Sequence, residues 1–213
     1  MRITLLSAAF LATGIASAAT PVDGWYTGLF GGYTYIPDYV TNNDHGLYMH
    51  QATFNNGYNA GGRAGYQSNP IRYEIEYTYL HADLNHYKIE GIHQKDISGF
   101  SSDNMIMANI YYDTPEMLPA IVPYLGAGIG YANVKTNINI NPYNANSYYF
   151  ETNDGAFAYQ GTVGITYNFA ENYAANLGYR FVATSHINNL GTSFEAHIAN
   201  AGVVYRFDRG NYK

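Results

Sequence analysis

Apolar and polar residues alternate along much of this chain, so that every second side chain has the same character. A period of two is typical of β-strands, in which successive side chains point to opposite faces of a sheet. The clearest segment is residues 72–79. One of its faces carries Tyr73, Ile75, Tyr77 and Tyr79, and the other carries Arg72, Glu74, Glu76 and Thr78. The same pattern predicts eight strands, over residues 25–36, 58–67, 72–79, 104–112, 121–134, 157–169, 173–181 and 197–207.

The segments between the predicted strands alternate in length. Short connections, which contain turn-forming residues such as Pro and Asn, fall at 68–70, 113–120 and 170–172. The other connections are long and rich in Asn, Asp, Gly and Ser, and they cover roughly 37–57, 81–103, 133–156 and 182–196. Tight turns on one rim and long loops on the other are expected of an outer-membrane β-barrel whose termini both lie on the periplasmic side.

The composition favours a membrane barrel over a water-soluble one. The chain has 24 tyrosines and 22 glycines, and 16% of its residues are aromatic. No run of 18 apolar residues follows the N-terminal segment, and alternating strands cross a membrane without one. The interior of an eight-stranded barrel is only wide enough for side chains to fill it, so we expect the glycine-bearing faces inside. A lipocalin-like soluble barrel would instead turn the bulky tyrosine-bearing faces inward around a ligand.

The N-terminus predicts export. Arg2 precedes a mostly apolar run over residues 3–15, and Ala16-Ser17-Ala18 forms a small-x-small cleavage site. Because this is the layout of a secretory signal peptide, we assign residues 1–18 to a signal peptide and residues 19–213 to one barrel domain. The chain has no cysteine, so no disulfide bond supports it, and a net charge of -6 without a Lys/Arg cluster argues against nucleic acid as a partner.

Six charged residues fall on the predicted inward faces. They are Arg63, Arg72, Glu74, Glu76, Arg180 and Arg206. Inside the barrel, the arginines avoid the roughly 2–4 kcal/mol that a cation costs at the lipid midplane. We expect these residues to satisfy one another as a structural plug. A positively biased lumen that passes small anions is the alternative, and the narrow interior favours the plug.

No motif predicts catalysis, a metal or a cofactor. All seven histidines fall in or beside the predicted long loops, namely His45, His50, His81, His86, His93, His186 and His197. Their spacing is not specific for a metal site, and solvated loop residues are a stronger interpretation than metal capture or a pH response. Ser185 and His186 are adjacent, so in an extended segment they point to opposite faces and cannot form a nucleophile–base pair. We therefore expect no enzyme.

Three groups of residues follow one another in a specific order and spacing. They are Gly24-Trp25-Tyr26-Thr27-Gly28, then Gly65-Tyr66-Gln67-Ser68-Asn69-Pro70 with Glu74 and Tyr77, and last Gly202 with Tyr205-Arg206-Phe207. Together they resemble the transmembrane domain of outer membrane protein A and its smaller, opacity-type relatives. The resemblance covers nearly all of residues 24–207. It implies an all-β fold, an eight-stranded antiparallel up-and-down transmembrane β-barrel that is monomeric and has a polar, plugged lumen.

The resemblance also implies partners and a location. The last strand is similar to the signal by which the barrel assembly machinery recognises outer-membrane barrels, and Gly202, Tyr205 and Phe207 are its residues here. Outer-membrane lipid and a host-surface ligand of the long loops are the other implied partners. Asn109, Thr166 and Asn176 replace charged residues of the family's central gate. We therefore expect a bacterial outer-membrane protein with a structural role and with loops for adhesion or host interaction; a small-solute porin-like channel is the alternative.

Overall fold

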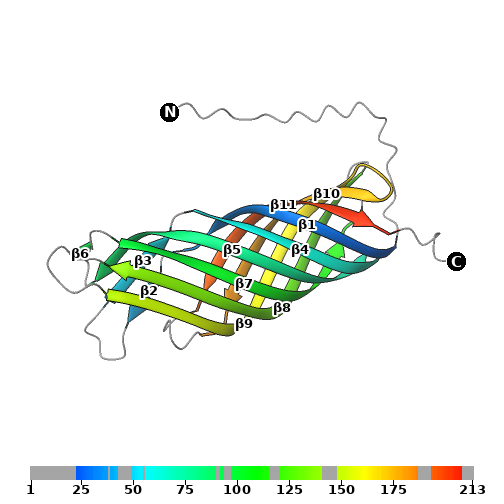
Figure 1. Ribbon diagram of the computed structural model, residues 1–213. Coiled ribbons are helices and arrows are strands. Elements are labelled where there is room, and N and C mark those ends of the chain that lie inside the picture. Colours follow the sequence, from blue (N-terminus) through cyan, green and yellow to red (C-terminus); the bar gives the residue numbers. More distant parts are fainter. Residues whose placement is uncertain are drawn as a thin grey trace, which may run out of the picture.

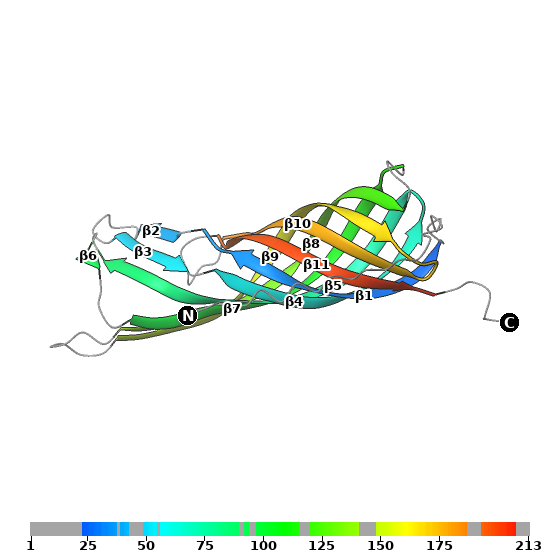
Figure 2. The ribbon, with the colours of Figure 1, turned by 90° about the horizontal axis from the view of Figure 1, so that it is seen from above.

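Eight long strands form one closed antiparallel barrel (Figures 1 and 2). The computed structural model describes residues 23–37, 39–42, 49–54, 56–89, 92–93, 97–115, 120–140, 148–186 and 193–207. The wall strands are β1 (Gly24–Tyr35), β4 (Gly57–Ser68), β5 (Ile71–Ile89), β7 (Ile97–Asp113), β8 (Ile121–Ile140), β9 (Tyr148–Asn168), β10 (Tyr173–Thr184) and β11 (Glu195–Arg206). Three short strands extend the sheet beside β5, namely β2 (Tyr39–Asn42), β3 (Met49–Phe54) and β6 (Ile92–His93).

Each wall strand pairs with the wall strands that precede and follow it in the chain. The barrel closes where β1 pairs with β11, along a ladder that runs from Tyr26↔Arg206 to Tyr35↔His197. The predicted fold class, an eight-stranded antiparallel up-and-down barrel, is confirmed. Among the described residues, no helix has the length and apolar character needed to cross a membrane.

The tight connections gather at one end of the barrel, which we call the turn rim. Residues 69–70 join β4 to β5 there, and residues 169–172 join β9 to β10. Both ends of the described chain lie at this rim, since the backbone N–H of Phe207 donates to the carbonyl oxygen of Trp25 at 2.9 Å and that of Asn69 donates to Asp23 Oδ1 at 2.9 Å. The opposite end, where the predicted long connections lie, is the loop rim.

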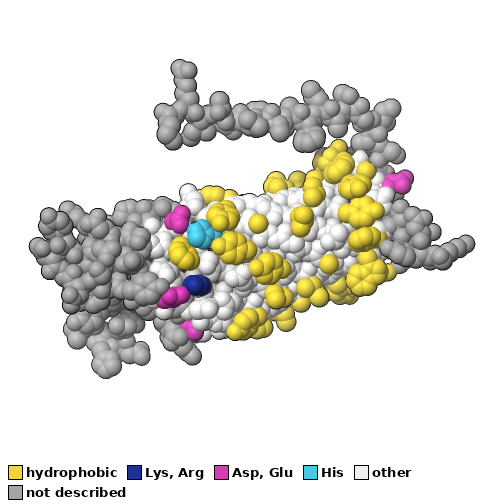
Figure 3. Space-filling view, viewed as in Figure 1, with side chains coloured by type: hydrophobic (Ala, Val, Ile, Leu, Met, Phe, Trp, Pro, Cys, Tyr) yellow, Lys and Arg dark blue, Asp and Glu magenta, His cyan; other side chains and the backbone are white. Residues whose placement is uncertain are grey.

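A belt of exposed apolar side chains surrounds the wall (Figure 3). Its middle is aliphatic and contains Leu29, Ile75, Leu125, Ile129, Val163, Leu177 and Val203. Its edge at the turn rim is aromatic, with Trp25, Tyr73, Phe169, Tyr173, Tyr205 and Phe207, and so is its edge toward the loop rim, with Tyr33, Tyr58, Tyr131, Phe157 and Tyr179. Aromatic girdles on both sides of an apolar band are typical of a barrel that spans a membrane.

The sequence-based strand limits were wrong on the side of the loop rim. Residues 81–89, 97–103, 135–140 and 148–156, which we assigned to loops, belong to β5, β7, β8 and β9. Beyond the belt the alternation continues with its polarity reversed: Asp83 points outward and is exposed, whereas Leu84 is buried. An outward polar face is favourable in water and unfavourable in lipid. Outward aromatic residues therefore stop at the edge of the belt, although the strands continue past it.

Candidate functional site in the barrel interior

The six predicted interior charges all lie inside the barrel. Strict alternation places them there, because each stands on the face opposite the apolar belt. Their exposed fractions are 8% for Arg63, 6% for Arg72, 3% for Glu74, 1% for Glu76, 1% for Arg180 and 6% for Arg206. Charges this deeply buried must be paired or hydrogen-bonded to be tolerated, so their partners define the chemistry of the interior.

The deepest pair joins β10 to β5 across the lumen. Arg180 Nη1 donates to Glu76 Oε1 and, at 3.3 Å, to Thr78 Oγ1. The Thr78 hydroxyl donates to the same Glu76 oxygen at 3.0 Å. The Arg180 guanidinium also lies 4.9 Å from the centre of the Phe30 ring, within cation–π distance. This pair links opposite sides of the wall near mid-height.

Glu74 connects several elements nearer to the turn rim. Its carboxylate accepts hydrogen bonds from the hydroxyls of Tyr26 at 2.9 Å and Tyr111 at 3.2 Å. Arg63 Nη1 and Arg72 Nη1 lie 3.9 and 4.0 Å from Glu74 Oε2. Two cations therefore share one carboxylate, and each of them needs further acceptors.

Those acceptors come from residues that were not among the six predicted interior charges. Arg72 Nε donates to both carboxylate oxygens of Asp113, at 3.1 and 2.9 Å, and Arg63 Nη2 donates to Asn176 Oδ1 at 3.1 Å. We had assigned Asp113 to a turn, but it ends β7 and is 5% exposed. Its even spacing from inward Asn109 and Tyr111 was a signal that could have identified it. Asn176, where the resemblance implied a charge, contributes a neutral amide instead.

Large aromatic side chains also occupy the interior, which corrects our expectation that tyrosines face only lipid. Tyr26, Phe30, Tyr111 and Tyr124 are all buried, with exposed fractions of 2–6%. Glycines on other strands make room for them. A Cβ atom at Gly65 would lie 2.5 Å from the Tyr26 hydroxyl oxygen, and one at Gly178 would lie 2.6 Å from that of Tyr124. The volume argument was correct for the glycines but missed the aromatic rings that fill the space they leave.

The part of the interior toward the loop rim contains a large apolar cluster, whereas we expected a polar lumen. We call this group the outer apolar cluster. Its largest members, all at most 2% exposed, are Ile36, Leu80, Met105, Met107, Val134, Val182, Phe194 and Ile198. Side chains therefore fill the lumen at two levels, with ion pairs toward the turn rim and mainly apolar side chains, beside buried Ser101 and Asp103, toward the loop rim.

The histidines with described side chains lie at or beyond the loop-rim edge of the belt. His81 Nε2 lies 3.3 Å from Asp83 Oδ1, and the hydroxyl of Tyr179 lies 2.6 Å from His197 Nδ1. His186 is exposed just after β10, next to exposed Ser185. The side chains of His45, His50, His86 and His93 lie outside the described set. Within the residues that the structure describes, no three His, Cys, Asp or Glu side chains form a metal-binding group.

The predicted assembly residues form the end of the closing strand. Gly202 on β11 pairs with Phe30 of β1 and Asn176 of β10. Tyr205 and Phe207 are each 37% exposed on the outer face, and their rings meet edge to face with centroids 5.1 Å apart. The C-terminal aromatic residues thus belong to the turn-rim girdle. The predicted signal peptide, residues 1–18, lies outside the described residues.

The sequence matches a known protein family over almost its whole length. A family model for the outer membrane protein β-barrel domain matches residues 3–207. The chain belongs to this family. Members of the family are proteins of the bacterial outer membrane, and the predicted location of this protein is thereby confirmed.

Individual relatives are more distant. A protein named outer membrane protein, from Gluconacetobacter diazotrophicus, is 26% identical over 225 residues, and the match covers 91% of this chain but only 58% of the relative. Neisserial surface protein A has a TM-score of 0.56 at 18% identity, with 86% of this chain and 97% of that chain covered. The outer membrane protein OprG from Pseudomonas aeruginosa has a TM-score of 0.55 at 13% identity, with 88% and 98% covered. These two structures show the shared fold.

The direction of insertion can be tested with introduced thiols, because the chain has no cysteine of its own. We expect the turn rim to face the periplasm, as in other barrels of this kind. Asn153 is exposed on β9 toward the loop rim, and Glu171 is exposed in the turn between β9 and β10. A membrane-impermeant maleimide should label Asn153→Cys on intact cells and should label Glu171→Cys only after the outer membrane is permeabilised. The reverse pattern would show that the barrel is inserted the other way.

The role of the C-terminal girdle in assembly leads to a second prediction. Phe207→Asp should accumulate as unfolded protein in the periplasm, because it removes the last aromatic residue and places a charge at the lipid face. Tyr33→Asp is the matched control, because it also replaces an exposed aromatic residue with aspartate, but on β1 in the girdle toward the loop rim. The assay is the mobility shift on heating that distinguishes folded from unfolded barrels in electrophoresis. Normal folding of Phe207→Asp would exclude the proposed signal.

Proposed function

We propose that this protein is a structural barrel of the outer membrane whose outer loops act in adhesion or host interaction. The observation that carries the proposal is the filled interior, with ion pairs toward the turn rim and the outer apolar cluster toward the loop rim. A lumen of this width that is occupied by side chains leaves little continuous water for a solute. Any role beyond envelope integrity therefore falls to the loops, and the proposal includes no catalytic activity.

The hairpin of β8 and β9 supports a role in surface contact. Its pairing continues past the belt, from Tyr131↔Phe157 to Ile140↔Tyr148, so the connection at residues 141–147 is carried beyond the apolar band. The described outward side chains on this extension are polar and include Lys135, whose Nζ lies 3.1 Å from Glu151 Oε1. The connecting sequence, Asn-Pro-Tyr-Asn-Ala-Asn-Ser, combines Tyr with small polar residues, a composition suited to adaptable protein contacts.

An exchange of this connection tests the proposal. Residues 141–147 would be replaced by a Gly/Ser segment of equal length, and the control would replace residues 170–172 at the turn rim in the same way. Non-adherent bacteria that express each variant would be counted on cultured epithelial monolayers and on immobilised extracellular-matrix protein. We expect the wild type and the control to adhere and the loop variant to lose adhesion while it still folds. Equal adhesion of all three, and of matching variants in the other outer loops, would contradict the proposal.

A further inference from the structure

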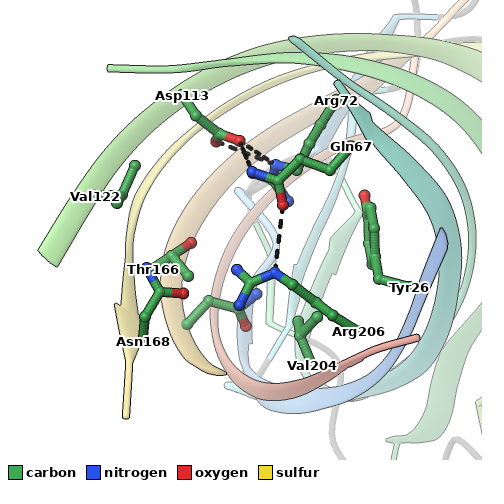
Figure 4. Close-up of a pocket in the computed structure, with 10 residues that line it drawn as sticks. Tyr26, Gln67, Arg72, Asp113, Val122, Thr166, Asn168, Val204 and Arg206 are labelled. Carbon is green, nitrogen blue, oxygen red and sulfur yellow. Dashed lines mark hydrogen bonds and ion pairs between the residues drawn. The ribbon is translucent and has the colours of Figure 1, made fainter. Parts of the chain in front are cut away.

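A small cavity lies in the interior close to the turn rim (Figure 4). Residues from all eight wall strands border it, among them Arg72, Asn168, Asn176, Arg206 and the carboxylate of Asp113. Its volume is about 10 Å³, which is roughly what one water molecule needs. The cavity can therefore hold a water molecule or a monatomic ion, and it is too small for a sugar or a peptide.

Hydrogen-bond donors without a partner surround this cavity. Arg206 Nη1, Arg72 Nη2 and the side-chain amide nitrogens of Asn168 and Asn176 have no acceptor among the described residues, and the amide oxygen of Asn168 has no donor among them. These four side chains are between 1% and 6% exposed, so bulk water does not satisfy them. In Figure 4 the guanidinium of Arg206 points into the space that Asn168 and Thr166 face from the other side. Buried donors of this kind are rare unless something occupies the space between them.

Arg206 is the interior arginine that forms no ion pair with a carboxylate of the described residues. Its Nε donates to Gln67 Oε1 at 3.4 Å, and Gln67 Nε2 in turn donates to Asp113 Oδ2 at 3.3 Å. Asp113 is already paired with Arg72 at 2.9 Å. No carboxylate oxygen of the described residues lies within 4.0 Å of the Arg206 guanidinium, whereas Arg63, Arg72 and Arg180 each have one.

The charges of this part of the interior do not balance. Four guanidinium groups, on Arg63, Arg72, Arg180 and Arg206, face three carboxylates, on Glu74, Glu76 and Asp113. The remaining buried carboxylate, Asp103, belongs to the loop-rim side, where Ser101 Oγ donates to it at 3.4 Å. It stands ten residues from Asp113 on the same strand, a distance of roughly 33 Å at about 3.3 Å per residue. Among the described residues, one positive charge is thus left without a carboxylate of its own beside the cavity, because Asp113 is already paired with Arg72.

We propose that this cavity is a binding site for a monatomic anion of the size of chloride. The anion accepts hydrogen bonds from Arg206 Nη1 and Arg72 Nη2, and it neutralises the charge of Arg206. Charge-assisted hydrogen bonds of this kind are stronger than those to a neutral acceptor. A water molecule would satisfy the same donors but would leave the charge unbalanced, and for this reason the geometry favours the anion. The site goes beyond the proposed surface role and does not depend on it.

Thermal unfolding of the refolded protein in zwitterionic detergent tests the site. Sodium chloride would be titrated against sodium gluconate at constant ionic strength, because gluconate is too large for the cavity. Chloride should raise the Tm in a saturable way, by about 3–6 °C at ten times the dissociation constant. Arg206→Gln should abolish this dependence. Lys135→Gln, which removes a partly exposed cation on β8 far from the cavity, should retain it.

Two outcomes would overturn the proposal. Equal Tm values in chloride and gluconate would mean that the cavity holds water only, and a chloride effect that persists in Arg206→Gln would place the anion elsewhere. A second measurement covers the case in which Arg206→Gln does not fold. Crystals of the wild-type protein grown in bromide should show an anomalous scattering peak within hydrogen-bond distance of Arg206 Nη1. No such peak at saturating bromide would exclude the site.

Discussion

Replacing Glu76 with alanine is expected to lower the free energy of unfolding by about 3–5 kcal/mol, because it leaves a buried guanidinium without its carboxylate. Glu76 and Arg180 are each 1% exposed, so solvent cannot replace the lost partner. The Phe30 ring and the Thr78 hydroxyl, which both contact Arg180, only partly compensate for the loss of the Glu76 carboxylate. Unfolding in urea from lipid vesicles of defined composition gives the value directly.

Two comparisons identify the cause of that loss. The double variant Glu76→Met with Arg180→Met removes both charges and fills similar space, so it should cost less than Glu76→Ala alone. Ile75→Leu exchanges one apolar side chain for another on the lipid face next to Glu76 and should cost less than about 1.5 kcal/mol. If Glu76→Ala cost no more than Ile75→Leu, water would have access to Arg180 and the interior would not be closed at this level.

A cation in the middle of the belt is the second large perturbation. Leu29 is 69% exposed and stands midway between the aromatic residues Trp25 and Tyr33 on the outer face of β1. Leu29→Arg should destabilise the folded barrel by about 2–4 kcal/mol, the cost of a cation at the bilayer midplane. The same urea titration from vesicles measures it.

The matched control introduces arginine outside the apolar band. Ser68 is exposed at the turn-rim end of β4, on the same outer face of the wall. Ser68→Arg should change stability by no more than about 1 kcal/mol, as expected near the interface. Similar losses for Leu29→Arg and Ser68→Arg would mean that the belt between the girdles does not lie in lipid.

The sequence was sufficient to predict the wall and the direction of most side chains. Within the belt, one face must meet lipid and the other must pack inside, so alternation alone placed Glu74 and Arg180 in the interior and Leu29 outside. Past the belt this rule reverses. Outward Asp83 and inward Leu84 then follow the pattern of a water-soluble sheet, within a stretch of sequence that is mostly polar. Neither these two positions nor the outer apolar cluster could be predicted without knowing the partner strands.

The interior network could be predicted only in part for a related reason. Alternation gives the face on which a residue lies but not its partner across the lumen. Arg180 and Glu76 are 104 positions apart in the chain, and their contact depends on the register of several strand pairs. Neutral participants carry an even weaker signal, since Asn176 and Gln67 could equally have been solvated polar residues. That Arg206 has no carboxylate partner among the described residues can be recognised only when the partners of the interior carboxylates are known.

Side chains close the lumen of this barrel, and the conductance of the purified, folded protein in planar lipid bilayers tests this closure most directly. With molar potassium chloride on both sides, we predict no current steps above those of the lipid alone. Reproducible ohmic steps that appear with the folded protein and vanish when it is unfolded beforehand would contradict the account and favour a small-solute channel.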